Sequence, residues 1–112
     1  MNIQSENKDL KLYNKEGVRV YSYRTYSDGF WSEYTYDEKG NELTFKDSDG
    51  YWDKHTYDEK GNELTFKDSD GFWYEYTYDE EGNKLTYKNS KGSWSERAYD
   101  EEGYLLTFKN SI

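Results

Sequence analysis

Apolar and polar residues alternate along short stretches of this chain, and a glycine interrupts the alternation every ten to twelve residues. In the stretch ELTFK, Leu64 and Phe66 are expected on one face of a strand, and Glu63, Thr65 and Lys67 on the other. The stretches between glycines are rich in the Tyr, Trp, Phe and Thr that strands favour. The pattern predicts about ten strands of ~6 residues and no helix, because apolar residues do not recur every 3.6 positions.

Each glycine marks a predicted turn. The nine glycines are Gly17, Gly29, Gly40, Gly50, Gly61, Gly71, Gly82, Gly92 and Gly103. Residues 37–40 and 47–50 both fit a type I turn closed by a glycine at positive φ, with an Asp whose side chain bonds the turn backbone. Nine turns between short strands predict an all-β fold. We expect an antiparallel meander of tandem β-hairpins in a curled single sheet or a solenoid-like arrangement.

The hairpins repeat with a period of 21 residues. The copies occupy residues 27–47, 48–68, 69–89 and 90–110, after a degenerate half-repeat. The first two copies differ only at Phe30/Tyr51, Ser32/Asp53, Glu33/Lys54 and Tyr34/His55. We expect a polar N-terminal segment over residues 1–9 and a single β domain over residues 10–112.

Leu43 and Phe45, with their counterparts in later copies, mark the predicted buried face of the sheet. The neighbouring strand offers two alternating sets of aromatic residues, one with Tyr and one with Trp. A shift of register by one residue exchanges the two sets. We expect the tyrosine set, with Tyr36, Tyr57 and Tyr78, to share the buried face.

Composition narrows the classes of function. The 112 residues carry a net charge of −9, the wrong sign for direct binding to nucleic acid or to an anionic membrane. There is no cysteine and no apolar run long enough to span a membrane. The sequence shows no signal peptide, so a cytoplasmic location is expected. Aromatic residues make up 21% of the chain, and we expect them to replace aliphatic residues as packing material.

The segments YDEKGNEL at 36–43 and 57–64, and YDEEGNKL at 78–85, resemble the YD repeat of the Rhs family. The segment 99–106 keeps Tyr-Asp and Gly but has Tyr104 in the place of Asn. The resemblance extends over residues 10–112 and implies antiparallel hairpins stacked edge to edge. In that family such repeats build hollow shells around a toxin, whereas this chain is too short to enclose cargo. The family's repeats carry scaffold residues, so the resemblance brings no active site.

The sequence does not predict an enzyme. His55 is the only histidine, and it has no fixed partners in the sequence, so we expect a surface or packing residue and neither a His-dependent triad nor a His-rich metal site. We also expect no metal and no cofactor. Most carboxylates belong to predicted turns, where Asp is favoured for backbone reasons. The segments DSDG at 47–50 and 68–71 resemble part of a calcium loop but lack its further ligands. Weak calcium binding at these turns is left open.

Two surfaces are candidates for binding. The first is an acidic rim of turn residues, which alternatively serves only solubility. It comprises Asp37, Glu38, Asp58, Glu59, Asp79, Glu80, Asp100 and Glu101. The second is the middle of the Trp-containing strand, where the copies differ most. The variation indicates either a binding surface that is adjusted from copy to copy or solvent-facing positions that are free to vary. This second surface comprises Trp31, Glu33, Tyr34, Trp52, Lys54, His55, Trp73, Glu75, Tyr76, Trp94, Glu96 and Arg97.

These features predict a non-catalytic binding or scaffold module that presents an acidic, aromatic surface to another protein with a basic surface. One alternative is a small acidic inhibitor, of the kind phages use against host defences, that occupies the basic nucleic-acid cleft of an enzyme. A further alternative is a repeat that binds carbohydrate or cell wall through its Trp and Tyr side chains. The two unpaired edges of such a sheet are also compatible with edge-to-edge self-association.

Overall fold

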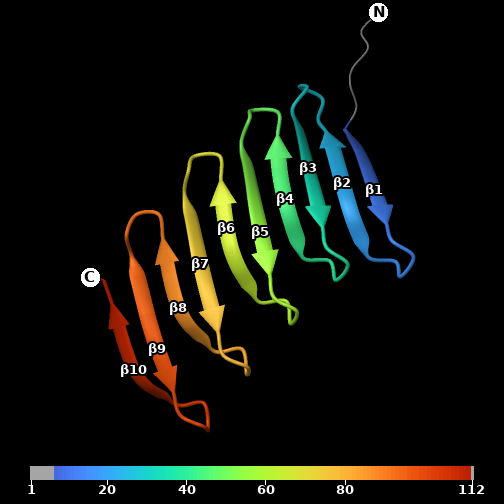
Figure 1. Ribbon diagram of the computed structural model, residues 1–112. Helices are drawn as coiled ribbons and strands as arrows, with labels where there is room; N and C mark the ends of the chain where they lie inside the picture. The colour runs from blue at the N-terminus through green and yellow to red at the C-terminus, as the bar shows by residue number, and fades with distance from the viewer. Residues whose placement is uncertain (1–6, 112) are drawn as a thin grey trace, which may run out of the picture. The chain divides into compact units, whose positions relative to one another are not determined.

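The computed structural model describes residues 7–111 and contains ten antiparallel strands that pair in sequence order (Figure 1). The strands are β1 (Lys8–Tyr13), β2 (Arg19–Thr25), β3 (Trp31–Tyr36), β4 (Glu42–Asp47), β5 (Trp52–Tyr57), β6 (Glu63–Asp68), β7 (Trp73–Tyr78), β8 (Lys84–Asn89), β9 (Trp94–Tyr99) and β10 (Leu105–Asn110). This confirms the predicted all-β meander of tandem hairpins. Nothing in the described part of the chain is a helix long and apolar enough to cross a membrane.

The chain divides into two compact units, residues 1–55 and residues 56–112, and each is described by itself. The first unit holds β1 to β4 and most of β5, and the second holds β6 to β10. Most of the polar N-terminal segment expected over residues 1–9 lies outside the described residues. Lys8 and Asp9 already belong to β1.

Every predicted turn is present. Each of the nine glycines has a positive φ, between 82° and 93°, as the predicted turns require. In the turn after β3, the Gly40 N–H donates to the Asp37 carbonyl at 3.0 Å. The Asp37 N–H donates to the Asn41 carbonyl at 2.9 Å. This is a three-residue hairpin loop, a type I turn followed by a left-handed residue, as the sequence predicts.

One face of each unit carries the tyrosines of the 21-residue copies, and we call it the tyrosine face. In the first unit Tyr34 lies opposite Phe45, with ring centroids 4.9 Å apart, and Phe45 lies opposite Asp53. In the second unit Tyr76 lies opposite Tyr87, with ring centroids 5.1 Å apart. Tyr36 stacks on Tyr34, and Tyr78 lies tilted against Tyr76, each with ring centroids 6.1 Å apart. The predicted sharing of this face is therefore confirmed for Tyr36 and Tyr78.

The opposite face of each unit carries tryptophan, threonine and paired charges, and we call it the tryptophan face. The cross-strand register sets its members. In the first unit they are Trp31, Glu33, Thr35, Thr44, Lys46, Trp52 and Lys54. In the second unit they are Trp73, Glu75, Thr77, Thr86, Lys88, Trp94 and Glu96.

A bulge recurs where the Trp-containing strand meets the turn, at Thr35/Tyr36 and again at Thr77/Tyr78. The extra residue interrupts strict alternation. Glu42, at the bulge, lies beside His55 on the tyrosine face. The corresponding Glu63 accepts a hydrogen bond from Tyr74, which lies opposite Phe66. The expectation that Glu63 faces away from Phe66 is therefore wrong, because simple alternation takes no account of a bulge.

The sheet has no enclosed core. Among the described residues no hydrophobic side chain is buried, and Ser32, at 6% exposure, is the one buried residue. Stacked rings and cross-strand pairs within the sheet take the place of a core. The end strands β1 and β10 lack one such neighbour. As a result they expose Leu10, Leu12, Leu106 and Phe108.

Gly50 tests how far the turns depend on glycine. Its φ is 93°, and a Cβ there meets nothing within 4 Å, so a substitution strains the backbone without a clash. We expect Gly50→Ala to lower the free energy of unfolding by about 1 kcal/mol. Gly50→Asn should lower it less, since Asn tolerates positive φ better. Urea unfolding followed by tryptophan fluorescence measures the difference, and an Ala variant as stable as the Asn variant would contradict the prediction.

Candidate functional site

The first Asp of each YD turn uses its carboxylate inside the turn. Asp37 Oδ1 accepts hydrogen bonds from the backbone N–H groups of Lys39 and Asn41, each at 2.9 Å. Its Oδ2 accepts from the Asn41 side-chain amide at 3.1 Å. Asp58 and Asp79 repeat all three bonds. These oxygens close the loop and are largely engaged before any partner arrives.

The bonds change the acidity of these groups. For Asp58 and Asp79, the backbone hydrogen bonds from Asn62 and Asn83 are the largest cause of a pKa lowered from the ordinary 3.8. For Asp37, partial burial raises the pKa, but the hydrogen bonds from Asn41 and Lys39 together outweigh it. The anionic form is thus the one that the turn stabilises.

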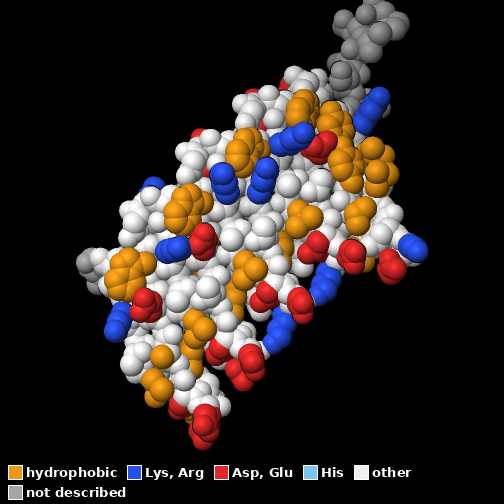
Figure 2. Space-filling model, in the orientation of Figure 1, with side chains coloured by type: hydrophobic (Ala, Val, Ile, Leu, Met, Phe, Trp, Pro, Cys, Tyr) orange, Lys and Arg blue, Asp and Glu red, His pale blue; other side chains and the backbone are white. Residues whose placement is uncertain are grey.

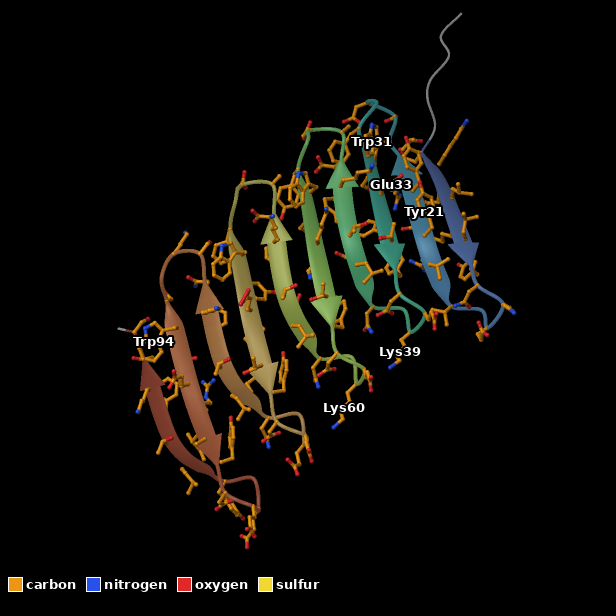
Figure 3. The ribbon with its side chains drawn as sticks, viewed as in Figure 1. Tyr21, Trp31, Glu33, Lys39, Lys60 and Trp94 are labelled. Atoms are coloured by element: carbon orange, nitrogen blue, oxygen red, sulfur yellow. The ribbon has the colours of Figure 1, made fainter. Side chains whose placement is uncertain are left out.

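The second acid of each turn points outward. Glu38, Glu59, Glu80 and Glu101 are all exposed, whereas the four preceding Asp residues are half-buried. Asp and Glu side chains gather at these turns (Figure 2), beside Lys39 and Lys60 (Figure 3). Lys60 Nζ donates to the Glu80 carbonyl of the next YD turn. The predicted acidic rim therefore consists of outward Glu carboxylates supported by Asp residues that hold the turns.

A groove lies on the tryptophan face of the first unit. Its volume is about 420 Å³, and Trp52 and Lys54 line one side of it. The Thr35 and Thr44 hydroxyls form its floor, with their oxygens 2.6 Å apart. Lys46 Nζ lies 3.2 Å from Glu33 Oε1 and lines the groove with it.

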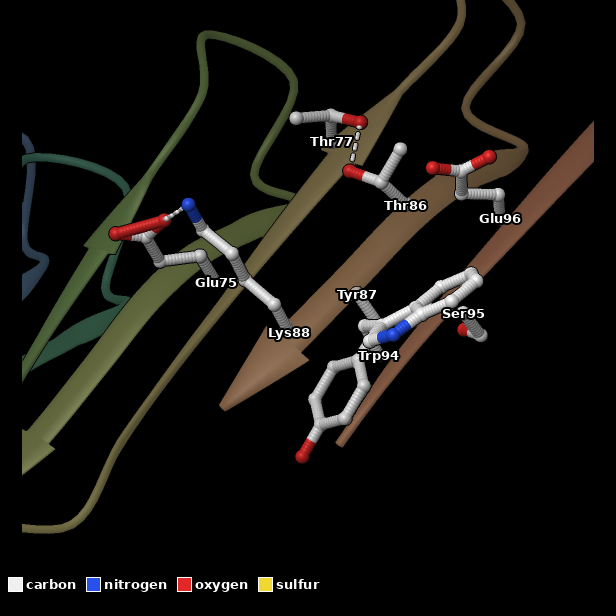
Figure 4. Close-up of a pocket in the computed structure, with 8 residues that line it drawn as sticks. All are labelled: Glu75, Thr77, Thr86, Tyr87, Lys88, Trp94, Ser95 and Glu96. Atoms are coloured by element: carbon white, nitrogen blue, oxygen red, sulfur yellow. Dashed lines mark hydrogen bonds and ion pairs between the residues drawn. The ribbon is translucent and has the colours of Figure 1, made fainter. Parts of the chain in front are cut away.

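The second unit has an equivalent groove of about 340 Å³ (Figure 4). Each residue that lines it lies 42 positions, or two repeats, after its counterpart in the first unit. Thr77 and Thr86 again lie 2.6 Å apart, and Lys88 Nζ lies 3.4 Å from Glu75 Oε2. Trp94 is 41% exposed over this groove. The two grooves therefore share the Trp, the Thr–Thr pair and the Glu–Lys pair, whereas Lys54 of the first corresponds to Glu96 of the second.

Glu33 has a second partner on the tryptophan face. Tyr21 donates its hydroxyl proton to Glu33 Oε2 at 2.6 Å, and both residues are on the face that carries Trp31 (labelled in Figure 3). This hydrogen bond is the largest cause that raises the pKa of Tyr21, to about 12. It is also the largest cause that lowers the pKa of Glu33.

The structure divides the predicted variable surface between the two faces. The tryptophan face holds Trp31, Glu33, Trp52, Lys54, Trp73, Glu75, Trp94 and Glu96. The tyrosine face holds Tyr34, His55, Tyr76 and Arg97. Adjacent variable positions alternate between faces, so the twelve residues do not form one surface. The threonine floor and the Lys46 and Lys88 side chains were missed, although the Lys and the second Thr recur in every copy and the first Thr recurs in the first three, with Ala98 in the fourth.

The serine directly after the LTF-type strand, which Ser48, Ser90 and Ser111 share, has a role that sequence reasoning also missed. Ser48 Oγ accepts the Trp31 N–H at 3.0 Å, while the Ser48 N–H donates to the Trp31 carbonyl. Ser90 and Ser111 do the same for Trp73 and Trp94. The invariance of Ser at this position in all four copies was the available signal.

His55 lies among carboxylates on the tyrosine face. Its Nε2 is 3.2 Å from Asp53 Oδ1 and 3.5 Å from Glu42 Oε2. The Tyr51 hydroxyl donates to Asp53 Oδ2 at 3.2 Å. Burial is the largest cause that raises the pKa of Glu42. In the described part of the chain, these three residues offer one imidazole and two carboxylate ligands within 4.8 Å of one another.

Comparison with known proteins finds a likeness in fold. No protein-family model and no curated protein matches the sequence. Solved chains do match, 33 of them in all. One is the crystal structure of TcdB2-TccC3-TEV, with a TM-score of 0.62 and 18% identity. The likeness covers 91% of this chain but 5% of that one, so the chain spans a small part of the structure that it resembles.

The turn carboxylates predict a defined acid sensitivity. A carboxylate whose pKa falls on folding stabilises the fold above its unfolded pKa, and this contribution is lost as the pH drops through the folded pKa. We expect stability to fall as the pH drops below 3.8. A triple variant, Asp37→Asn, Asp58→Asn and Asp79→Asn, should lose less over the same range, since amide oxygens accept the same backbone bonds without titrating. Urea midpoints at stepped pH test this, and parallel curves would contradict it.

The raised pKa of the Tyr21 hydroxyl predicts a loss of stability at alkaline pH, whereas the turn carboxylates predict a loss at acid pH. A raised pKa stabilises the fold below the unfolded value of 10.0, and the contribution is lost as the pH rises through about 12. Glu33→Gln should bring the Tyr21 pKa down toward 10.0. Glu75→Gln, at the equivalent position in the second unit, should leave it unchanged. NMR titration of the labelled tyrosine ring measures both, and an unchanged pKa in Glu33→Gln would refute the assignment.

Proposed function

We propose that this chain is a non-catalytic binding or scaffold module that presents its repeated surface to another protein. The observation that carries the proposal is the duplicated groove on the tryptophan face, in which a Trp, a Glu–Lys pair and a Thr–Thr floor recur 42 residues apart. A frame fixed by turn chemistry, with grooves that share these side chains, suits recognition of another protein. A bound partner would supply the apolar cover that the sheet itself lacks.

The acidic rim supports a partner with a basic surface. The outward carboxylates of Glu38, Glu59, Glu80 and Glu101 are exposed on a chain of net charge −9. Rows of like charge steer an oppositely charged protein during encounter, and this attraction weakens as salt increases. The same rim supports the narrower proposal that the chain inhibits an enzyme by occupying its basic nucleic-acid cleft.

The hairpin architecture supports kinship with the YD repeats of the Rhs family. The YDEKGNEL motifs of the sequence become hairpin loops, and the fold is similar to part of TcdB2-TccC3-TEV. We propose on this basis that the chain serves as a scaffold of hairpins. The exposed apolar residues of β1 and β10 support edge-to-edge association with further strands, including those of a second copy.

Carbohydrate binding is the second candidate, and one observation favours it. Trp94 exposes 41% of its surface beside the groove of the second unit, as a ring that stacks on a sugar does. Stacking on an indole is nearly independent of salt, whereas docking of a basic protein on the rim is not. Ionic strength therefore separates the two functions.

The decisive experiment is affinity capture by the immobilised chain from cells that encode it, with elution by a salt gradient and a glycan array run in parallel. We expect a protein partner that elutes with salt and binds at least ~10-fold more weakly, about 1.4 kcal/mol, to a variant with Glu38, Glu59, Glu80 and Glu101 changed to Gln. A matched variant makes the same charge change elsewhere, with Glu16→Gln, Asp28→Asn, Asp49→Asn and Asp70→Asn. It should retain most of the affinity.

Two outcomes would overturn the proposal. Binding to glycans with no protein retained would assign carbohydrate recognition instead. Equal losses in the two charge variants would show that the rim acts only through net charge.

A further inference from the structure

The second copy of the repeat differs from the first at four positions, and three of these changes meet at one point. Tyr51, Asp53 and His55 replace Phe30, Ser32 and Tyr34. The Tyr51 hydroxyl bonds Asp53 Oδ2, and Asp53 Oδ1 lies against His55 Nε2. The rest of the two copies is nearly identical, and these three changed residues contact one another. They therefore form one connected cluster and are not scattered over the surface.

The bulge adds a third ligand to this cluster. Glu42 reaches the tyrosine face because of the register shift at Tyr36, and its Oε2 lies 3.5 Å from His55 Nε2. The His55 and Asp53 side chains are 16% and 14% exposed, and Glu42 is 35% exposed. Solvent therefore reaches the cluster from one side, where a water ligand could complete a coordination shell.

We infer that Glu42, Asp53 and His55 form a binding site for a divalent transition metal, with zinc as the best fit. Tetrahedral zinc holds N and O ligands at ~2.0–2.1 Å, which separates neighbouring donor atoms by about 3.3 Å. The two separations from His55 Nε2, 3.2 and 3.5 Å, bracket this value. One imidazole with two carboxylates suits zinc better than calcium or magnesium, which prefer oxygen ligands alone.

Tyr51 acts as a positioning residue for this site. By donating to Asp53 Oδ2, it turns Oδ1 toward His55. Hydrogen bonds to a coordinating carboxylate orient it and strengthen metal binding. A tyrosine appears at this position only in the copy that carries Asp53 and His55, since the other copies have Phe30, Phe72 and Ser93.

The other copies lack the ligand set, which gives an internal comparison. One strand pair further along, Glu63 of the second copy takes the place of Glu42, but Tyr74 and Tyr76 of the third copy replace the Asp and the His, and Tyr74 bonds Glu63 directly. At the next such pair, Lys84 of the third copy stands in the place of Glu42, and Ser95 and Arg97 of the fourth copy occupy the other two positions. The inference is thus specific to the junction of the first and second copies and is independent of the proposed protein partner. It revises the expectation from composition that a single histidine brings no metal site.

Isothermal titration of the full chain with zinc chloride at pH 7.5, in excess magnesium to occupy surface carboxylates, tests the site. We expect one zinc ion to bind per chain. When Co²⁺ replaces zinc, we expect the visible d–d absorption bands of a cobalt ion in a low-symmetry coordination site. The double variant Asp53→Ser and His55→Tyr restores the residues of the first copy, where this backbone accommodates them, and should abolish the one-to-one binding. Tyr51→Phe, which also restores a residue of the first copy, should weaken binding about 10-fold.

Two comparisons keep the result unambiguous. Glu42→Gln should lose zinc binding, whereas Glu16→Gln removes an exposed carboxylate elsewhere in the same unit and should leave the affinity unchanged. Circular dichroism of each variant without metal verifies that it is folded. Absence of saturable one-to-one binding, or equal binding by the double variant, would overturn the inference and assign any remaining zinc to the acidic surface.

Discussion

The hairpin loop closed by an Asp and a left-handed Gly is the constraint on which the rest of this structure depends. A sheet with no enclosed core has no packing layer to hold its strands in register, so the turns and the ladders between strands must do so. Asp37 shows how one side chain serves this end, with two backbone N–H groups and one amide bonded to its carboxylate. The glycine then returns the chain at a φ that other residues reach only with strain. Both kinds of turn in the repeat use the same device.

Side chains in this protein pack against side chains of the neighbouring strands on the same face of the sheet. Rings on the tyrosine face contact rings of the neighbouring strand, as Phe66 does with Tyr74 at 5.0 Å between centroids. On the other face, Thr–Thr and Glu–Lys pairs join the same strands. Aromatic residues suit this arrangement because they bury large areas against a neighbour even when one side remains wet. The composition, rich in Tyr and poor in Leu, matches a sheet that is open on both sides.

Much of this architecture was accessible from the sequence, because its determinants are local. Glycine spacing and Asp at the first turn position define loops within five residues, and period-two alternation assigned Tyr36 and Tyr78 correctly. The position of the bulge was not visible, since an inserted residue leaves no mark in composition, and Glu63 was therefore assigned to the wrong face. The variable positions were grouped by their adjacency in sequence, yet neighbours in a strand point to opposite sides, as Glu33 and Tyr34 do. The cluster around His55 needed both the register and the bulge, so the comparison of copies alone did not show it.

Because each strand pairs only with the strands before and after it along the chain, ordering one hairpin does not require distant segments to meet first. Loop-closure entropy is correspondingly small, and folding rates rise as the average sequence separation of contacts falls. Such a chain behaves as a one-dimensional array, in which stability accumulates from each unit and its nearest neighbours. Gain or loss of one 21-residue copy would therefore leave the remaining strands paired with their neighbours by the same rule. A longer or shorter array would extend or shorten the sheet without a new packing problem.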